Sequence, residues 1–302
     1  MSPQFNENLL AQIYVEVDDL LQAYENFRAQ KVSENLSCST REPDLSPSEI
    51  VTILVAYHAS GYKCFEYYYR ECILKACLHC FPKAPTYKCF DSYIGRSLPL
   101  VLLVLMCKCA QSLRSGYYFI DSKKLVVCHL KREHSHKVFK GFARKGKSST
   151  GWFYGLKQHL VINHLEEIVS FSLTPGSTAD NNFRVLTSLL AGLKGKCCGD
   201  KGYLTTLFEQ FYTEGLQLLV KAKENMKVLP AFHSDIQLLD HRSVIESVND
   251  ILITICDIEH SRHRNAFHGL ASILSALTCY QYLPHKPHIF IPDTVNYLQA
   301  AA

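Results

Sequence analysis

The hydrophobic pattern of the chain changes at Ser115-Gly116, and this change does most to limit the folds available to it. Upstream, apolar residues recur at the spacing of amphipathic helices, whereas downstream they form short runs bounded by turn residues, which is typical of strands. We therefore predict a small all-helical N-terminal domain over residues 1–115, a second domain containing a sheet over 116–283, and a loosely held C-terminal tail over 284–302.

The clearest local helix signal in the first domain lies at residue 46. Ser46-Pro47-Ser48-Glu49 combines an N-cap serine, a proline at the first helical position and a glutamate three residues after the cap. An apolar helix over 50–59 follows and Gly61 ends it. Helices over 65–80 and 87–113 complete the unit, in which a helix-turn-helix is one interpretation among several.

The second domain begins with strands and then alternates strands with helices. The expected elements are strands over 117–120, 125–128, 156–163 and 167–174, a helix over 182–193, a strand over 196–199, a helix over 204–211, a strand over 216–221 and a helix from about 242. A meander followed by alternation predicts an α+β or α/β fold in which helices flank a mixed sheet.

Composition limits the class of protein. Hydrophobic residues make up 47% and charged residues 20%, which argues against disorder for most of the chain. The apolar run over 98–107 is half the length of about 20 residues that a membrane-spanning helix needs, and no secretory signal is evident at Met1. The 13 cysteines are odd in number, and Cys256 and Cys279 fall within apolar patterns, so we expect reduced thiols in a soluble, cytoplasmic protein.

Positive charge is concentrated between Asp121 and Thr150. This window has a net charge of +7, and the rest of the chain has −3. Its basic residues are Lys123, Lys124, Lys131, Arg132, Lys137, Lys140, Arg144, Lys145 and Lys147, joined below neutral pH by His129, His134 and His136. Such a cluster suits a polyanion such as a nucleic-acid backbone, although a solvated basic loop would have the same charge.

Three carboxylates occupy positions that suit a catalytic group. Asp121 is expected at the end of the first strand, Asp200 at the end of a later strand, and Glu246 on the helix that begins near Arg242. On a helical wheel, the stripe of Val244, Val248, Ile251 and Ile255 should pack on the sheet. Arg242, Glu246 and Asn249 lie opposite that stripe, a set able to bind a metal and a phosphate.

Three converging carboxylates suit two Mg²⁺ ions roughly 4 Å apart, which activate a water and stabilise the leaving oxygen in phosphodiester cleavage. Taken alone, each of these carboxylates is better explained as an ordinary surface or helix-face charge. The placement of two of them at strand ends, with the basic window between them, favours the metal site.

Other clusters point elsewhere. Cys77, His79 and Cys80, near Cys72 and Cys89, suggest a zinc site, but no second CxxC pair accompanies them. In the run 259–264, Arg262 and Arg264 stand among the histidines and favour a phosphate contact over a metal. Motifs for nucleotide hydrolysis, serine hydrolysis and metalloproteolysis are missing from the sequence. Trp152 is expected to pack in the core, with stacking on a base as the alternative.

Seven motifs resemble, in order, the bacterial insertion-sequence 982 family of DDE transposases, within the insertion-sequence 4-like superfamily. They are Phe119-Ile120-Asp121-Ser122, His136-Lys137-Val138-Phe139-Lys140-Gly141, Gly151-Trp152-Phe153-Tyr154-Gly155-Leu156-Lys157, Leu173-Thr174-Pro175-Gly176, Gly199-Asp200-Lys201-Gly202-Tyr203, Ile245-Glu246-Ser247-Val248-Asn249-Asp250 and Glu259-His260-Ser261-Arg262-His263-Arg264. The similarity runs from the region of Val17 to about Tyr282.

The resemblance implies a ribonuclease-H-like catalytic core with Asp121, Asp200 and Glu246 as the DDE triad. It implies two Mg²⁺ ions, with Mn²⁺ as a substitute, and cleavage and strand transfer at the ends of a mobile element. The expected DNA-binding residues are Lys123, Arg132, His136, Lys137, Lys140, Arg144, Lys147, Lys201, Arg242, Asn249, Arg262 and Arg264.

The expected partners are double-stranded DNA, as terminal inverted repeats and as target, and a second copy of the chain in a homodimer on DNA. No membrane and no nucleotide cofactor are expected, and the expected location is the bacterial nucleoid. In one respect the chain departs from the family, because Ile253 stands where a lysine is usual after the glutamate. Two other readings remain: a catalytically impaired DNA-binding relic, which Ile253 favours, and a zinc-dependent regulator.

Overall fold

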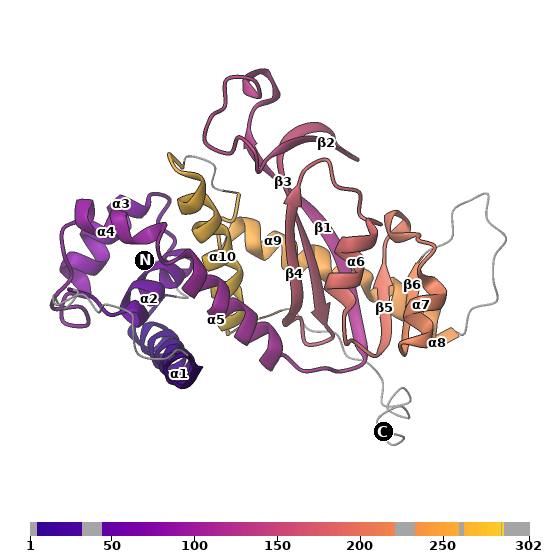
Figure 1. Ribbon diagram of the computed structural model, residues 1–302, viewed down its shortest axis with the longest axis horizontal. Helices are drawn as coiled ribbons and strands as arrows, with labels where there is room; N and C mark the ends of the chain where they lie inside the picture. Colours follow the sequence, from indigo (N-terminus) through magenta and orange to yellow (C-terminus); the bar gives the residue numbers. More distant parts are fainter. Residues whose placement is uncertain (1–4, 32–43, 221–232, 260–262, 285, 287–302) are drawn as a thin grey trace. The chain divides into compact units, whose positions relative to one another are not determined.

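The computed structural model describes residues 5–31, 44–220, 233–259, 263–284 and 286 (Figure 1). The chain forms two compact units. One comprises Met1–Lys108 with Leu252–Pro284, and the other comprises Cys109–Ile251 with His285–Ala302. The predicted tail lies outside the described residues, apart from Pro284 and Lys286.

The first unit is helical. Its elements are α1 (Glu7–Lys31), α2 (Pro47–Ser60), α3 (Phe65–Tyr68), the π-helix η1 (Tyr69–Ala76), α4 (Tyr87–Ile94), most of α5 (Leu98–Gln111) and α10 (Ala266–Tyr282). α2 is buried along most of its length and packs against α1 and α10. The predicted burial of Cys256 and Cys279 is confirmed, since neither has exposed surface.

The ends of α2 form as their residues dictate. The Ser46 side chain accepts from the Glu49 backbone N–H at 3.1 Å, and Glu49 Oε2 accepts from the Ser46 backbone N–H at 2.6 Å. Gly61 ends the helix with φ 79°, a left-handed conformation that costs glycine little. The predicted capping box and stop are both confirmed.

Two of the predicted helices are interrupted. The helix expected over 65–80 is a short α-helix continued by the π-helix, and it ends at Ala76. The helix expected over 87–113 is broken into α4 and α5, which are bent by 61°. Pro99 explains the break, because it has no N–H for the carbonyl of Gly95 and its ring would clash there. Among the described residues, no single helix is long and apolar enough to cross a membrane.

The second unit is a six-stranded mixed sheet with helices. Its strands are β1 (Tyr117–Cys128), β2 (Arg144–Ser148), β3 (Gly151–Asn163), β4 (Ile168–Pro175), β5 (Gly195–Gly199) and β6 (Leu216–Val220). The order is β2-β3-β1-β5-β6, and β4 pairs with β3 on the same side as β2. β1 to β4 pair antiparallel, whereas β1-β5-β6 are parallel. This mixed α/β architecture is consistent with the predicted ribonuclease-H-like fold.

Helices cover both faces of this sheet (Figure 1). On one face, Tyr118 and Ile120 of β1 form a core with α6 (Phe183–Leu190) and with Phe211 of α7 (Phe208–Thr213). The opposite face of β1 meets α9 (Val244–Thr254), which follows α8 (His233–Asp240) and the 3₁₀ turn η4 (His241–Ser243). η2 (Leu130–Arg132) and η3 (Lys201–Tyr203) are single turns.

The structure corrects the strand limits. The two strands expected over 117–120 and 125–128 are one strand, β1, which runs without interruption through Asp121. β3 starts at Gly151, five residues before its expected start. β1 is continuous because its residues 121–124 pair with β3, and β3 starts early because its residues 151–155 pair with β2. α10 also groups with the N-terminal helices, although the predicted second domain extends to 283.

Candidate active site

Asp121 lies at the point where β1 parts from β5. The parallel pairing of the two strands covers Tyr117–Phe119, with Phe119 opposite Cys198. The same register, continued by two residues, places Asp121 opposite Asp200, which directly follows β5. Asp121 is therefore inside its strand rather than at its end, which corrects the prediction, yet both aspartates fall at the carboxyl edge of the parallel pair.

The half-buried Asp121 carboxylate contacts α9. Asn249 Nδ2 donates to Asp121 Oδ2 at 3.0 Å. Burial raises the pKa of Asp121 to about 6, and the charges of Glu246 and Asp180 add to the rise. The Ser122 backbone N–H and the Arg242 guanidinium act in the opposite direction. Five groups, from β1, the loop after β4 and the η4–α9 segment, thus act on one carboxylate.

Glu246 lies one helical turn before Asn249. Its side chain is 57% exposed, and Arg242 Nη2 donates to its Oε1 at 2.8 Å. The buried stripe of α9 is shifted from the predicted one: Asn249 is buried, whereas Ile251 and Ile255 are only half-buried. The helical wheel predicts that Asn249 lies on the polar side of the helix. This prediction is wrong, because the Asn249 amide faces the sheet and donates a hydrogen bond to Asp121.

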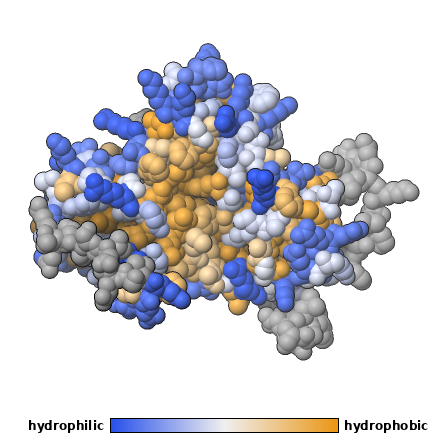
Figure 2. All heavy atoms as spheres, in the orientation of Figure 1, coloured by the Kyte–Doolittle hydropathy of each residue, from blue (hydrophilic) through white to orange (hydrophobic). Residues whose placement is uncertain are grey.

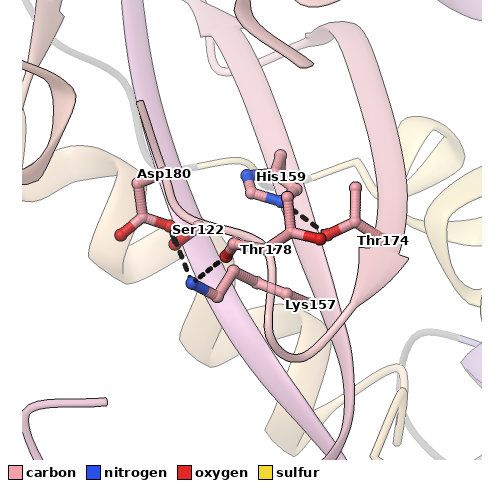
Figure 3. Close-up of polar contacts among 6 residues, drawn as sticks. All are labelled: Ser122, Lys157, His159, Thr174, Thr178 and Asp180. Carbon is pink, nitrogen blue, oxygen red and sulfur yellow. Dashed lines mark hydrogen bonds and ion pairs between the residues drawn. The ribbon is translucent and has the colours of Figure 1, made fainter. Parts of the chain in front are cut away.

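A fourth carboxylate, Asp180, lies beside this edge (Figure 3). Its Oδ1 accepts from Ser122 Oγ at 2.6 Å and from Lys157 Nζ at 3.0 Å. Lys157 also donates to the Thr178 carbonyl at 2.8 Å. A Cβ on Gly202 would lie 3.4 Å from Asp180 Oδ2, so the loop after β4 reaches the turn that follows Asp200.

His159 belongs to the same face of β3 as Lys157. Its Nε2 is 2.9 Å from Thr174 Oγ1, and the side chain is fully buried. Burial lowers the pKa of His159 to about 4, an effect that the Lys157 charge reinforces and the Asp180 charge opposes. This imidazole is neutral at pH 7.

The sequence gives one weak sign of these three residues. Lys157, Gln158 and His159 are three consecutive polar residues that precede an apolar run in β3, and all three are buried. Buried polar side chains of this kind need partners. The partner, Asp180, lies in a turn 23 residues after Lys157, so spacing alone could not identify it.

A comparison with known protein families identifies the family of this chain. A family model described as "Transposase DDE domain" matches residues 111–266, which is more than half of the chain. The chain belongs to the transposase DDE domain family. A comparison with curated proteins gives no match. The matched range contains Asp121, Asp180, Asp200 and Glu246.

Family membership assigns the chain to transposition and DNA recombination, and it implies a transposase-type enzyme that binds DNA. DDE transposases generally depend on a divalent metal ion. Among the described residues, no group of three His, Cys, Asp or Glu side chains is close enough to hold one. The donor set nevertheless fits a hard cation, because Asp121, Asp200 and Glu246 supply only oxygen atoms.

The predicted DNA-binding residues lie mostly at the protein surface. Figure 2 shows hydrophilic side chains covering the connection between β1 and β2, at the top of the view. Exposed members of the predicted set in the sheet unit are Arg132, Lys137, Lys140, Arg144, Lys147 and Lys201, and Lys123, His136 and Arg242 are half-buried. Arg264 is exposed in the helical unit, and Arg262 lies outside the described residues.

Trp152 is not a core residue. Its side chain is 56% exposed on β3, so the prediction of core packing is wrong. The reason is the register: Trp152 pairs with Lys147 on β2, an edge strand whose other face is the one that packs. Lys145 and Lys147 lie over its ring, with their Nζ atoms 5.3 and 5.9 Å from the centroid.

Proposed function

We propose that the chain is a transposase of the insertion-sequence 982 family that nicks the ends of its element and joins the freed 3′-hydroxyl to target DNA. The observation that carries this proposal is the contact of α9 with β1, which places Glu246 within electrostatic range of Asp121. The β1–β5 register supports Asp200 as the third member.

Asp121, Asp200 and Glu246 would hold two Mg²⁺ ions, which supply an activated water and stabilise the leaving oxygen. Asn249 fixes the orientation of the Asp121 carboxylate through its hydrogen bond. Arg242 forms an ion pair with Glu246 at 2.8 Å, on the same side of the η4–α9 segment. Lys137, Lys140, Arg144 and Lys147, all exposed, would neutralise the DNA backbone, and binding should therefore weaken steeply with salt.

The helical unit is proposed to recognise the terminal inverted repeats, in a homodimer that pairs the two ends of the element. The mass of the complex with DNA that carries the repeats, compared with that of the free protein, tests the homodimer. One copy per pair of ends would contradict the dimer.

The test of catalysis is a Mg²⁺-dependent nicking assay on labelled DNA that carries the flanking repeats. Asp121→Asn, Asp200→Asn and Glu246→Gln should each reduce nicking about a hundredfold or more, because each removes an anionic metal ligand. Glu209→Gln, an exposed change on α7 in the same unit, should keep full activity. Nicking that survives all three active-site changes would refute the assignment.

A DNA-binding relic is the second candidate. Ile253 favours it, because an apolar side chain stands, half-buried on α9, where the family usually has a lysine. Binding without nicking in the wild type, unaffected by the three active-site changes, would establish the relic. Nicking regained by Ile253→Lys would then locate the fault at that residue.

A further inference from the structure

The ribbon of β2 and β3 has one packed face and one open face. Opposed residues on paired strands share a face, so Gly146 and Phe153 lie on one side, where both are buried. Gly146 meets the backbone of Gly176 directly. The pairs Lys145–Tyr154 and Lys147–Trp152 therefore lie on the other side of the ribbon.

The open face combines an aromatic ring with cations. Trp152 is 56% exposed, and both lysine ammonium groups lie within 6 Å of its ring centroid, close enough for a cation–π attraction. Lys145 also pairs with Glu133 at 3.8 Å, whereas Lys147 is exposed beside the indole. The surrounding window from Asp121 to Thr150 carries +7, so the ligand that complements this face is an anion.

The exposed Trp152 ring distinguishes between duplex and single-stranded nucleic acid as the ligand of this face. A duplex presents phosphates to lysines, but its bases are stacked on one another and offer no free π-face. A single strand offers both, which is why proteins that bind it combine basic grooves with exposed aromatic side chains. We propose that this face of the β2–β3 ribbon binds single-stranded DNA, with Trp152 stacked on an unpaired base and Lys145 and Lys147 on the adjacent phosphates.

This inference deepens the proposed function, on which it rests for the identity of the nucleic acid, since strand cleavage leaves a free end. We infer that the β2–β3 ribbon binds the strand end freed by cleavage, rather than the intact duplex. Trp152 is the one tryptophan of the sequence, so fluorescence excited at a wavelength that tyrosine does not absorb reports on this position alone.

The first experiment is a fluorescence titration of the full chain with a thymidine oligonucleotide of about 15 nucleotides, and in parallel with a duplex of the same length. Stacking should quench Trp152 saturably with the single strand, and several-fold less with the duplex. Equal quenching by both, or no quenching by the single strand, overturns the proposal.

The second experiment measures the affinity of labelled oligonucleotide for variants. Trp152→Ala should weaken single-strand binding about tenfold or more, and Trp152→Phe should restore part of it, because the ring is what stacks. Lys145→Gln with Lys147→Gln should lower the slope of log affinity against log salt by about 1.4. Tyr212→Ala, the loss of a 70% exposed ring on α7, and Lys194→Gln are the matched controls and should bind as wild type.

The nicking assay, run on the same preparation, separates the two proposals. Nicking by the wild type with no single-strand response would overturn the ribbon site and leave the transposase intact. A saturable single-strand response without nicking would support the ribbon site while the proposed catalysis failed. Single-strand affinity that is unchanged in a folded Trp152→Ala protein overturns the site in either case.

Discussion

At Lys157 an ammonium group sits almost wholly inside the protein. The side chain is 10% exposed; Asp180 balances its charge, and the Thr178 carbonyl accepts a hydrogen bond from it. Taking a charge out of water is unfavourable unless such partners are present. The loop after β4 is therefore held to β3 by a contact that cannot be lost without leaving the Lys157 charge poorly solvated.

Asp180→Ala should lower the free energy of unfolding by about 2 kcal/mol, because it leaves a buried cation with one neutral acceptor. Chemical denaturation measures the change. Glu66→Ala removes an exposed helical ion pair with Arg70 and should cost about 0.5 kcal/mol or less. A loss no larger than that of the control would mean that Lys157 finds other partners.

His159 predicts a pH dependence with a definite sign. Its folded-state pKa of about 4 lies below the ordinary value of 6.5, so the unfolded chain binds more protons between these limits. Stability contributed by the neutral imidazole is present above pH 6.5 and should be lost as the pH falls towards 4. The expected loss is on the order of 2 kcal/mol.

Denaturation curves at pH 7 and pH 4.5 for wild type and His159→Gln test this, because the difference between the two proteins isolates the imidazole. Isolation matters, since the raised pKa of Asp121 acts in the opposite direction: stability from its protonation is present below pH 3.8 and lost above about 6. His134→Gln, at a side chain 94% exposed, should keep the wild-type profile. A pH dependence of stability in His159→Gln that is identical to that of the wild type would show that the buried imidazole is not its source.

Among elements, the edge strand β2 depends on a backbone contact. Gly146 meets the carbonyl of Gly176, so no side chain fits between them. Gly146→Ala should therefore push the ribbon away from the turn after β4 and cost about 1–3 kcal/mol by overpacking. Lys147→Ala, on the open face of the same strand, should change the free energy of unfolding by less than about 0.5 kcal/mol. Equal losses for Gly146→Ala and Lys147→Ala in thermal or chemical denaturation would show that the turn after β4 moves to accommodate the added methyl group.

The elements also show what the sequence can predict. The start of α2 depends on Ser46 and Glu49, which lie within one turn of each other, and its end depends on Gly61. Both ends could therefore be predicted from local sequence. The exposure of Trp152 could not be predicted because it depends on the turn after β4, whose Gly176 packs against Gly146 and Phe153 on the other face of the ribbon. The continuity of β1 likewise depends on pairing with β3 about 40 residues away. Candidate carboxylates could be named from the sequence, whereas Asp180 and the position of Asn249 required the fold.

For the molecule as a whole, α10 belongs with the N-terminal helices. It packs against α2 and α4, and Ala271, Ala276 and Leu277 have no exposed surface. The predicted boundary at 283 followed chain order, and chain order cannot show that a late helix returns to an early unit. The limits of the domains as folding units remain a prediction.

A chain ending at residue 264 lacks α10 and should lose amide protection in α2, while β1 and β3 keep theirs. Hydrogen exchange read by mass spectrometry measures this difference. A chain ending at residue 284 keeps α10 and is the control. Simultaneous loss of protection in α2 and in the sheet would mean that the two units unfold together.

β3 is one unbroken strand of 13 residues, with Trp152 near its start and Leu160, the partner of Asp121, eight residues on. A paired strand barely stretches, so these points are separated by a contour of about 26 Å at 3.3 Å per residue. β3 cannot shorten without losing its pairs with β1 and β2, so its length fixes the distance between a single strand bound at Trp152 and the carboxylate of Asp121.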